Sequence, residues 1–329
     1  MKRFFLGCML LAFLSSCQKE YSEQFVPYNN NVFNSDTAWK PSNANGIAAR
    51  LIIPALLTAP MIDSFDAVTG GEIRFPENII IVFPPHACAG NGSISYTGKI
   101  VVEVTYLRKK GDFIRYGKPT TSFNNLLQTG GSFNVVLSQN GIPLNLVPGI
   151  SYKIKYRNPA PVSDMKFFYE DVWISGADST TTWTAGLNTA GNVNVWQQYD
   201  TATQSIIKGY EITSSKLRWI NCDFFNDTTM PYSRINVSLP LNFTNNNTSV
   251  YAVFKNKNIV AAFKTDAVSK LFYLPKIPIG SELVLVSVSK IGNDYYLGKK
   301  EIIATNANLV SLNPEQKSLA EISNFLNSL

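Results

Sequence analysis

Histidine and charge are scarce in this chain, and their scarcity limits the chemistry that it can carry. Its 329 residues contain a single histidine, His86, so paired-histidine zinc sites are excluded and a Ser-His-Asp triad has only that residue to use. Charged residues make up 16% of the chain, and lysine and arginine form no block, so nucleic acid is not an expected partner. We expect no catalytic residue, no metal site and no cofactor, and therefore not an enzyme.

Cysteine is also rare, and the four copies have different expected fates. Cys8 and Cys17 lie in the N-terminal segment, whereas Cys88 and Cys222 lie far apart, and neither has a Cys-x-x-Cys partner. In an oxidising compartment these two could form a disulfide bond. We prefer two unpaired, buried thiols, because they fall in different predicted domains and free cysteine packs as a small apolar residue.

The only long apolar run is N-terminal and is too short to span a bilayer. Lys2 and Arg3 precede the run Phe4–Phe13, whereas a spanning helix needs about 20 residues. The following Leu14-Ser15-Ser16-Cys17 resembles the lipobox of bacterial lipoproteins, which implies cleavage before Cys17 and acylation of that residue. Three acyl chains would anchor the protein in a membrane. Gln18 and not aspartate follows the cysteine, which favours the outer membrane, with the cell surface as one destination. A plain signal peptide with a chance cysteine is the alternative.

Composition and pattern divide the chain into four predicted segments. Residues 1–16 form a lipoprotein signal peptide, and the polar, aperiodic stretch 17–45 is a tether or an ordinary solvated linker. Asn158–Pro161 interrupts the strand pattern, because proline donates no ladder hydrogen bond. We therefore predict an N-terminal β-sandwich-like domain over 46–158 and a C-terminal β-rich domain over 159–329.

The period of two that dominates after residue 50 predicts a mostly β fold with two β-sandwich-like units. Tyr152, Ile154 and Tyr156 alternate with basic residues, and Asn140-Gly141 is a strong hairpin signal. Further hairpins are predicted at 250–263 and 283–303. The end of the chain differs, because apolar residues three to four apart after Pro314 predict a short C-terminal amphipathic helix that packs on the last sheet.

Two segments carry a resemblance to known proteins. Thr69-Gly70-Gly71-Glu72-Ile73-Arg74-Phe75, followed by Val82-Phe83-Pro84-Pro85-His86-Ala87, resembles the β-sandwich module of ankyrins, zonula-occludens proteins and netrin receptors. The run from Gly111 to Phe133 is similar to uncharacterised Bacteroidetes-type surface lipoproteins. This resemblance implies a non-enzymatic interaction or structural module. Some relatives cleave themselves at a His-Phe-Ser type site, but Ala87 and Cys88 follow His86, so that activity is not carried over.

Four of the five tryptophans lie between residues 163 and 233, and three of them are candidate ligand-binding residues: Trp173, Trp183 and Trp196. Exposed on one face, they would form a platform for sugar rings, with Asn192, Asn194, Gln197 and Gln198 as hydrogen-bonding neighbours. Burial in the core is the preferred interpretation.

Two functions follow from these features, and both place the chain at a membrane through its lipid anchor. The first is a non-catalytic interaction or structural module with an envelope protein as its partner. The alternative is a carbohydrate-binding surface lipoprotein that assists glycan uptake. Glycoside hydrolysis would need two carboxylates that meet in space; Glu72, Glu103, Glu170 and Glu211 are the candidates, and solvated strand faces are preferred for them.

Overall fold

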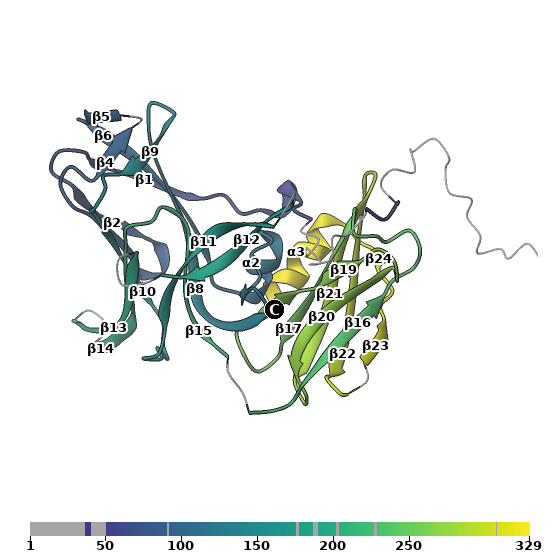
Figure 1. Cartoon of the computed structure of the whole chain (residues 1–329). Coiled ribbons are helices and arrows are strands. Elements are labelled where there is room, and N and C mark those ends of the chain that lie inside the picture. Colours follow the sequence, from purple (N-terminus) through teal and green to yellow (C-terminus); the bar gives the residue numbers. More distant parts are fainter. Residues whose placement is uncertain are drawn as a thin grey trace, which may run out of the picture. The chain divides into compact units, whose positions relative to one another are not determined.

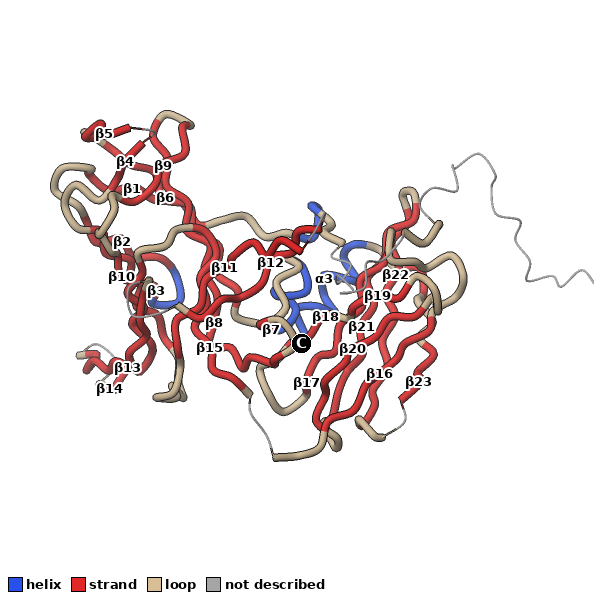
Figure 2. Tube along the Cα trace, in the orientation of Figure 1, coloured by secondary structure: helices blue, strands red, loops and turns tan. Residues whose placement is uncertain are grey.

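The computed structural model confirms a mostly β chain with several sheets and a short C-terminal helix (Figures 1 and 2). The structure describes residues 37–40, 51–90, 92–175, 178–186, 190–201, 204–226, 229–306 and 308–329. The predicted signal peptide, Cys17 and most of the predicted tether lie outside the described residues. Within the described part, no helix combines the length and apolar character that crossing a membrane requires.

The larger sheet of the first sandwich is organised around one 15-residue strand, β8. Its strands are β1 (Met61–Asp66), β4 (Cys88–Gly90), β5 (Gly92–Ser95), β6 (Lys99–Leu107), β7 (Thr121–Ser122), β8 (Asn125–Gln139), β9 (Ile142–Leu146), β11 (Lys166–Ser175), β12 (Asp178–Ala185) and β15 (Arg218–Phe225). β8 pairs with β6 and with β15, and β9 follows β8 through the predicted hairpin. Asn140 and Gly141 both adopt positive φ in that turn, as the Asn-Gly signal predicts.

The second sheet of this sandwich packs across the first and encloses a common core. Its order is β13 (Gly191–Asp200), β14 (Ser205–Ser214), β10 (Tyr152–Arg157), β3 (Ile79–Phe83) and β2 (Gly71–Phe75). Inward residues of both sheets, among them Ile81, Ile154, Val102 and Val135, are fully buried in one cluster. Alternation along each strand therefore leaves the other face of the second sheet open for polar residues.

The predicted domain boundary at 158/159 is wrong, because it falls inside this sandwich. β10 ends at Arg157 and pairs along its whole length with β14, and β15 pairs with β8. Tyr210, Ile212 and Cys222 from beyond the boundary lie in the same core as the earlier strands. Asn158–Pro161 is thus a connection within one sandwich, since a proline break interrupts a strand without ending a domain.

The second sandwich follows directly and has its own core. One sheet has the order β19 (Lys264–Asp266), β20 (Leu271–Pro278), β16 (Tyr232–Ser238) and β23 (Asn308–Ser311). The other has the order β18 (Val260–Ala262), β17 (Thr248–Phe254), β21 (Glu282–Ile291), β22 (Asp294–Ile303) and β24 (Glu315–Gln316). Both predicted hairpins of this region, β17–β18 and β21–β22, are confirmed.

Two short helices pack together on the outer face of the sheet that contains β17 and β21. The C-terminal helix α3 (Leu319–Ser328) buries Ile322 and Leu326 there, as predicted. Its start was misplaced, because Ser318 and Glu321 form a capping box, whereas Pro314 precedes the strand β24. The other helix is α2 (Lys110–Arg115), and Lys109 is its N-terminal cap residue.

Candidate functional site

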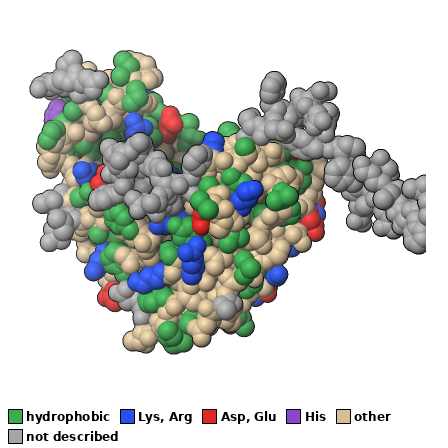
Figure 3. Space-filling model, turned by 45° about the vertical axis from the view of Figure 1, so that its right-hand side comes forward, with side chains coloured by type: hydrophobic (Ala, Val, Ile, Leu, Met, Phe, Trp, Pro, Cys, Tyr) green, Lys and Arg blue, Asp and Glu red, His purple; other side chains and the backbone are tan. Residues whose placement is uncertain are grey.

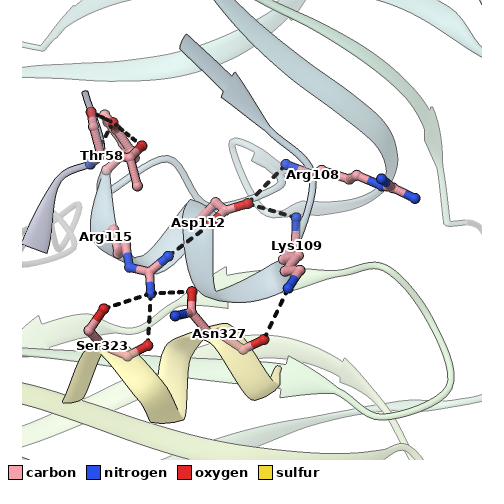
Figure 4. A network of polar contacts seen from close by, with 8 residues as sticks. Thr58, Arg108, Lys109, Asp112, Arg115, Ser323 and Asn327 are labelled. Carbon is pink, nitrogen blue, oxygen red and sulfur yellow. Dashed lines mark hydrogen bonds and ion pairs between the residues drawn. The ribbon is translucent and has the colours of Figure 1, made fainter. Parts of the chain in front are cut away.

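The contact between α2 and α3 is a dense polar network that joins distant parts of the chain (Figure 4). Arg115 is buried and pairs with Asp112 at 3.0 Å, and its other terminal nitrogen donates to the Ser323 carbonyl and to Asn327 Oδ1, both at 2.8 Å. Asp112 Oδ2 in turn accepts the backbone N–H of Lys109 at 2.9 Å. The network fixes α3 on α2, which is a structural role.

Glycine at position 111 is required by this helix contact. A Cβ atom at Gly111 would lie 1.9 Å from the backbone oxygen of Leu326, so no side chain fits between the helices. A small cavity beside the contact is lined by Ile53, Leu56, Ile114 and Arg115, among others. It has room for about one water molecule. It is too small for an organic ligand.

The structure does not bring the predicted tryptophan platform together. Trp183 on β12 is 3% exposed, packs against Leu127 and Phe168, and donates its indole N–H to the Pro119 carbonyl at 2.8 Å. Trp196 lies in the other sheet, on β13, and is half-buried. Trp173 is on β11, and its side chain lies outside the described part of the structure. A platform shared by Trp183 and Trp196 is therefore ruled out.

Three of the four candidate carboxylates are engaged by separate cations. Glu72 pairs with Arg74, Glu170 pairs with Lys118 at 2.5 Å, and Glu211 accepts from both Lys153 and Lys155 at 3.2 Å. Across the described residues, no group of three or more His, Cys, Asp or Glu side chains is placed to hold a metal ion. His86 is exposed in the turn before β4.

Cys88 and Cys222 are free and buried in the first core, so the expectation of two unpaired thiols is confirmed. Burial raises the pKa of the Cys88 thiol to about 11 and that of Cys222 further above its usual value. Because the thiolate is the reactive form, both groups are inert near neutral pH.

Asp223 is the one fully buried carboxyl group in the described structure. Asn221 Nδ2 donates to its Oδ2 at 2.6 Å, and its Oδ1 has no hydrogen-bond partner among the described residues. Burial raises the pKa of Asp223 well above its usual value of about 3.9, so folding favours the protonated form of this group.

Asp223→Asn is expected to flatten the dependence of stability on pH. An unfolded chain loses this proton above about pH 4, whereas the folded chain keeps it, so the stabilisation is complete below pH 4 and declines as pH rises towards the raised folded pKa. The amide cannot ionise and retains an oxygen acceptor for Asn221. In urea unfolding between pH 5 and 9, the free energy of unfolding of the variant should rise relative to that of the wild type as pH increases. A difference that stays constant with pH would contradict protonation of the folded state.

A group of exposed apolar side chains lies at the end of the hairpin β13–β14. β10 pairs with β14 from Ser214 to Gly209, and Asn158 N donates to the Lys208 carbonyl at 2.9 Å, so Ser205–Ile207 has β13 as its sole strand partner in the described structure. We call residues 195–200 and 205–208 the arm. Val195, Tyr199 and Ile206 in the arm are 47%, 58% and 57% exposed, and Tyr199 and Ile206 are directly opposite each other.

The outer edge of β13 is also open. β13 is the end strand of its sheet, and no second strand pairs with it among the described residues (Figure 1). From Gly191 to Tyr199 it carries no charged residue. Proteins usually protect such edges with charges, proline or bulges, because unpaired backbone groups attract further strands. The arm thus combines an unprotected edge with exposed apolar side chains.

The open face of the second sheet carries a different set of side chains. Asn192, Asn194, Trp196 and Gln198 alternate onto this face of β13, opposite the core. Trp196 lies across Gly209, because its indole N–H donates to the Tyr210 carbonyl on β14 at 2.9 Å. On β10, basic residues alternate with the buried tyrosines and reach the same face. We call this set the amide–tryptophan face.

Cations do not gather into one block on the surface seen in Figure 3, where Lys and Arg side chains lie singly or in small groups among uncharged ones. Comparisons with protein-family models, with curated proteins and with solved structures find no match to this chain. The arm and the amide–tryptophan face are the two candidate contact surfaces of the described structure.

Proposed function

We propose that this chain is a lipid-anchored, non-catalytic interaction protein of the bacterial envelope, and that the arm is its contact surface. The observation that carries the proposal is the exposure of Val195, Tyr199 and Ile206 beside an unpaired, uncharged strand edge. Burying one large apolar side chain contributes about 1.5–3 kcal/mol, so these three residues give a partner a substantial gain. A two-stranded ribbon that extends beyond its sheet is marginal in water by itself, which favours the same outcome.

We expect the arm to contact a partner, and replacing its exposed apolar side chains should abolish that contact. In the variant Tyr199→Lys/Ile206→Lys, two charges replace the exposed apolar pair without touching the core. Mildly detergent-extracted wild type should sediment as an assembly larger than one chain, and this variant as a single chain. Ile62→Lys/Val268→Lys changes two apolar residues elsewhere that are more exposed than the arm pair, and should leave the assembly intact. Sedimentation of the wild type as a single chain would refute the proposal.

The anchor is placed at Cys17, in keeping with the lipobox resemblance and with residence in the outer membrane. Cys17→Ala should prevent acylation, because no other thiol lies at the cleavage boundary. We expect the variant in the soluble fraction or as an unprocessed precursor, whereas Cys88→Ala should remain in the membrane fraction. The measurement is detergent-phase partitioning, and an unchanged distribution of Cys17→Ala would exclude lipid attachment at this residue.

A second candidate function is glycan binding on the amide–tryptophan face. It is supported by the half-buried indole of Trp196, which donates its N–H to the Tyr210 carbonyl and shares a face with two amides and the basic residues of β10. Sugar rings stack on such indoles, and amides hydrogen-bond to their hydroxyls. Trp196→Ala should then abolish retention on a glycan array without loss of folding. Absence of any wild-type retention removes this candidate.

A further inference from the structure

We propose that the occupant of the open β13 edge is β13 of a second copy of this chain, paired antiparallel about a twofold axis. Such pairing presupposes that the arm is the contact surface, as proposed above. A twofold axis normal to the sheet joins the β13-containing sheets of the two copies into one continuous sheet. Equivalent faces of the two sheets then lie on the same side. Residues directly opposite each other then lie on the same face of the joined sheet. The twofold axis must therefore pass through a residue of β13 and not between two residues.

The exposed residues select one of these registers. With the axis at Gln197, Val195 lies opposite Tyr199 of the second copy, and Tyr199 lies opposite its Val195. Aromatic and β-branched residues are favourable cross-strand partners, and this register forms two symmetry-related pairs of Val195 with Tyr199. The same register places Trp196 opposite Gln198 and Asn194 opposite Asp200. Moving the axis to Val195 would instead place Tyr199 opposite Gly191.

The distribution of charge on β13 is compatible with pairing to a second copy. Like charges directly opposite each other destabilise a strand pair, and a twofold pair matches a strand with itself. β13 avoids this conflict, because Asp200 is its only charged residue and meets Asn194 rather than another carboxylate. The opposite edge of the same sheet differs, since β2 carries Glu72 and Arg74. That edge has the protection that β13 lacks.

The Gly191 end of the strand limits where the second copy can pair. An ideal Cβ on Gly191 would lie 2.9 Å from the Phe167 ring of β11, so this end is close to the opposing sheet. The register about Gln197 pairs residues 194–200 with one another and leaves Gly191 outside the contact. The pairing thus uses the part of β13 that carries the exposed Val195 and Tyr199.

Cysteine cross-linking in the full chain, within its own membrane, tests the register. Gln197→Cys places two thiols at the axis, where opposite Cβ atoms are about 4.5–5.5 Å apart, within reach of a disulfide after small adjustments. Asn192→Cys, on the same strand, is five residues from the axis, so its two copies would be roughly 30 Å apart. The native Cys88 and Cys222 are buried and should remain unreacted.

We expect mild oxidation to convert more than half of Gln197→Cys into a covalent dimer and less than a tenth of Asn192→Cys. Adding Tyr199→Lys to Gln197→Cys should reduce the dimer at least tenfold. Unfolding midpoints equal to the wild type show that each variant is folded. If Gln197→Cys gives no dimer while the arm-dependent assembly persists on sedimentation, the partner is a different chain, and the second-copy inference fails while the interaction function stands. If neither the covalent dimer nor the larger assembly is found, the second-copy inference and the interaction function are both wrong.

Discussion

Trp183→Ala is expected to lower the free energy of unfolding by about 3–5 kcal/mol. The indole is 3% exposed and fills the space between Leu127 and Phe168, with Trp219 and Phe225 at its margin. Truncation to alanine removes these contacts and leaves a cavity that rigid strands cannot close. It also leaves the Pro119 carbonyl without its donor. Guanidinium denaturation followed by circular dichroism gives the loss directly.

Trp196→Ala is the matched control for this change. Trp196 is half-buried on the open face of a sheet, and its loss should cost about 1–2 kcal/mol. The two tryptophans are therefore expected to differ clearly in their unfolding midpoints. Equal, small effects would mean that Trp183 is not part of a packed core.

Arg115→Met is expected to destabilise the protein by about 3 kcal/mol, because one change removes the donor for three groups. Asp112, the Ser323 carbonyl and Asn327 Oδ1 all lose a hydrogen bond, and Asp112, whose side chain is 18% exposed, also loses its cationic partner. Methionine keeps much of the side-chain volume, so the loss reports on the polar network. Thermal unfolding should show a lower midpoint and early release of α3.

Arg74→Met is the matched control, since Arg74 forms an ion pair with Glu72 on the surface of β2. The Arg74 side chain is 70% exposed, and surface pairs contribute 0–1 kcal/mol at most, about a third of the expected Arg115 effect. If the two arginine variants unfold alike, the helix network does not stabilise the fold.

The parts of the fold that follow from a simple period were predictable from the sequence. Hairpins β17–β18 and β21–β22 combine apolar alternation with polar turns, and Asn140-Gly141 specifies a turn that needs two residues at positive φ. The apolar stripe of α3 was equally clear. Its start was misplaced because Pro314 obscured the capping box of Ser318 and Glu321, which was a readable signal.

Strands β12 and β13 were not predicted, because threonine, serine, asparagine and glutamine dominate them and few apolar residues mark the period. The domain boundary was misplaced for a related reason. Strand pairing between β8 and β15 joins residues about 90 positions apart, and no local pattern reports such a partner. The arm has no sequence signal of its own, since exposure of Val195 and Tyr199 depends on where β10 ends.

Hydrogen exchange at β13 tests most directly whether the arm is the contact surface. Amides of residues 194–200 that point to the open edge should exchange at least tenfold more slowly in the wild-type assembly than in the Tyr199→Lys/Ile206→Lys variant. Amides of β2, at the other edge of the same sheet, should exchange equally in both. Equal exchange at β13 in the two proteins would show that the edge stays exposed to water, and would contradict an interaction function centred on the arm.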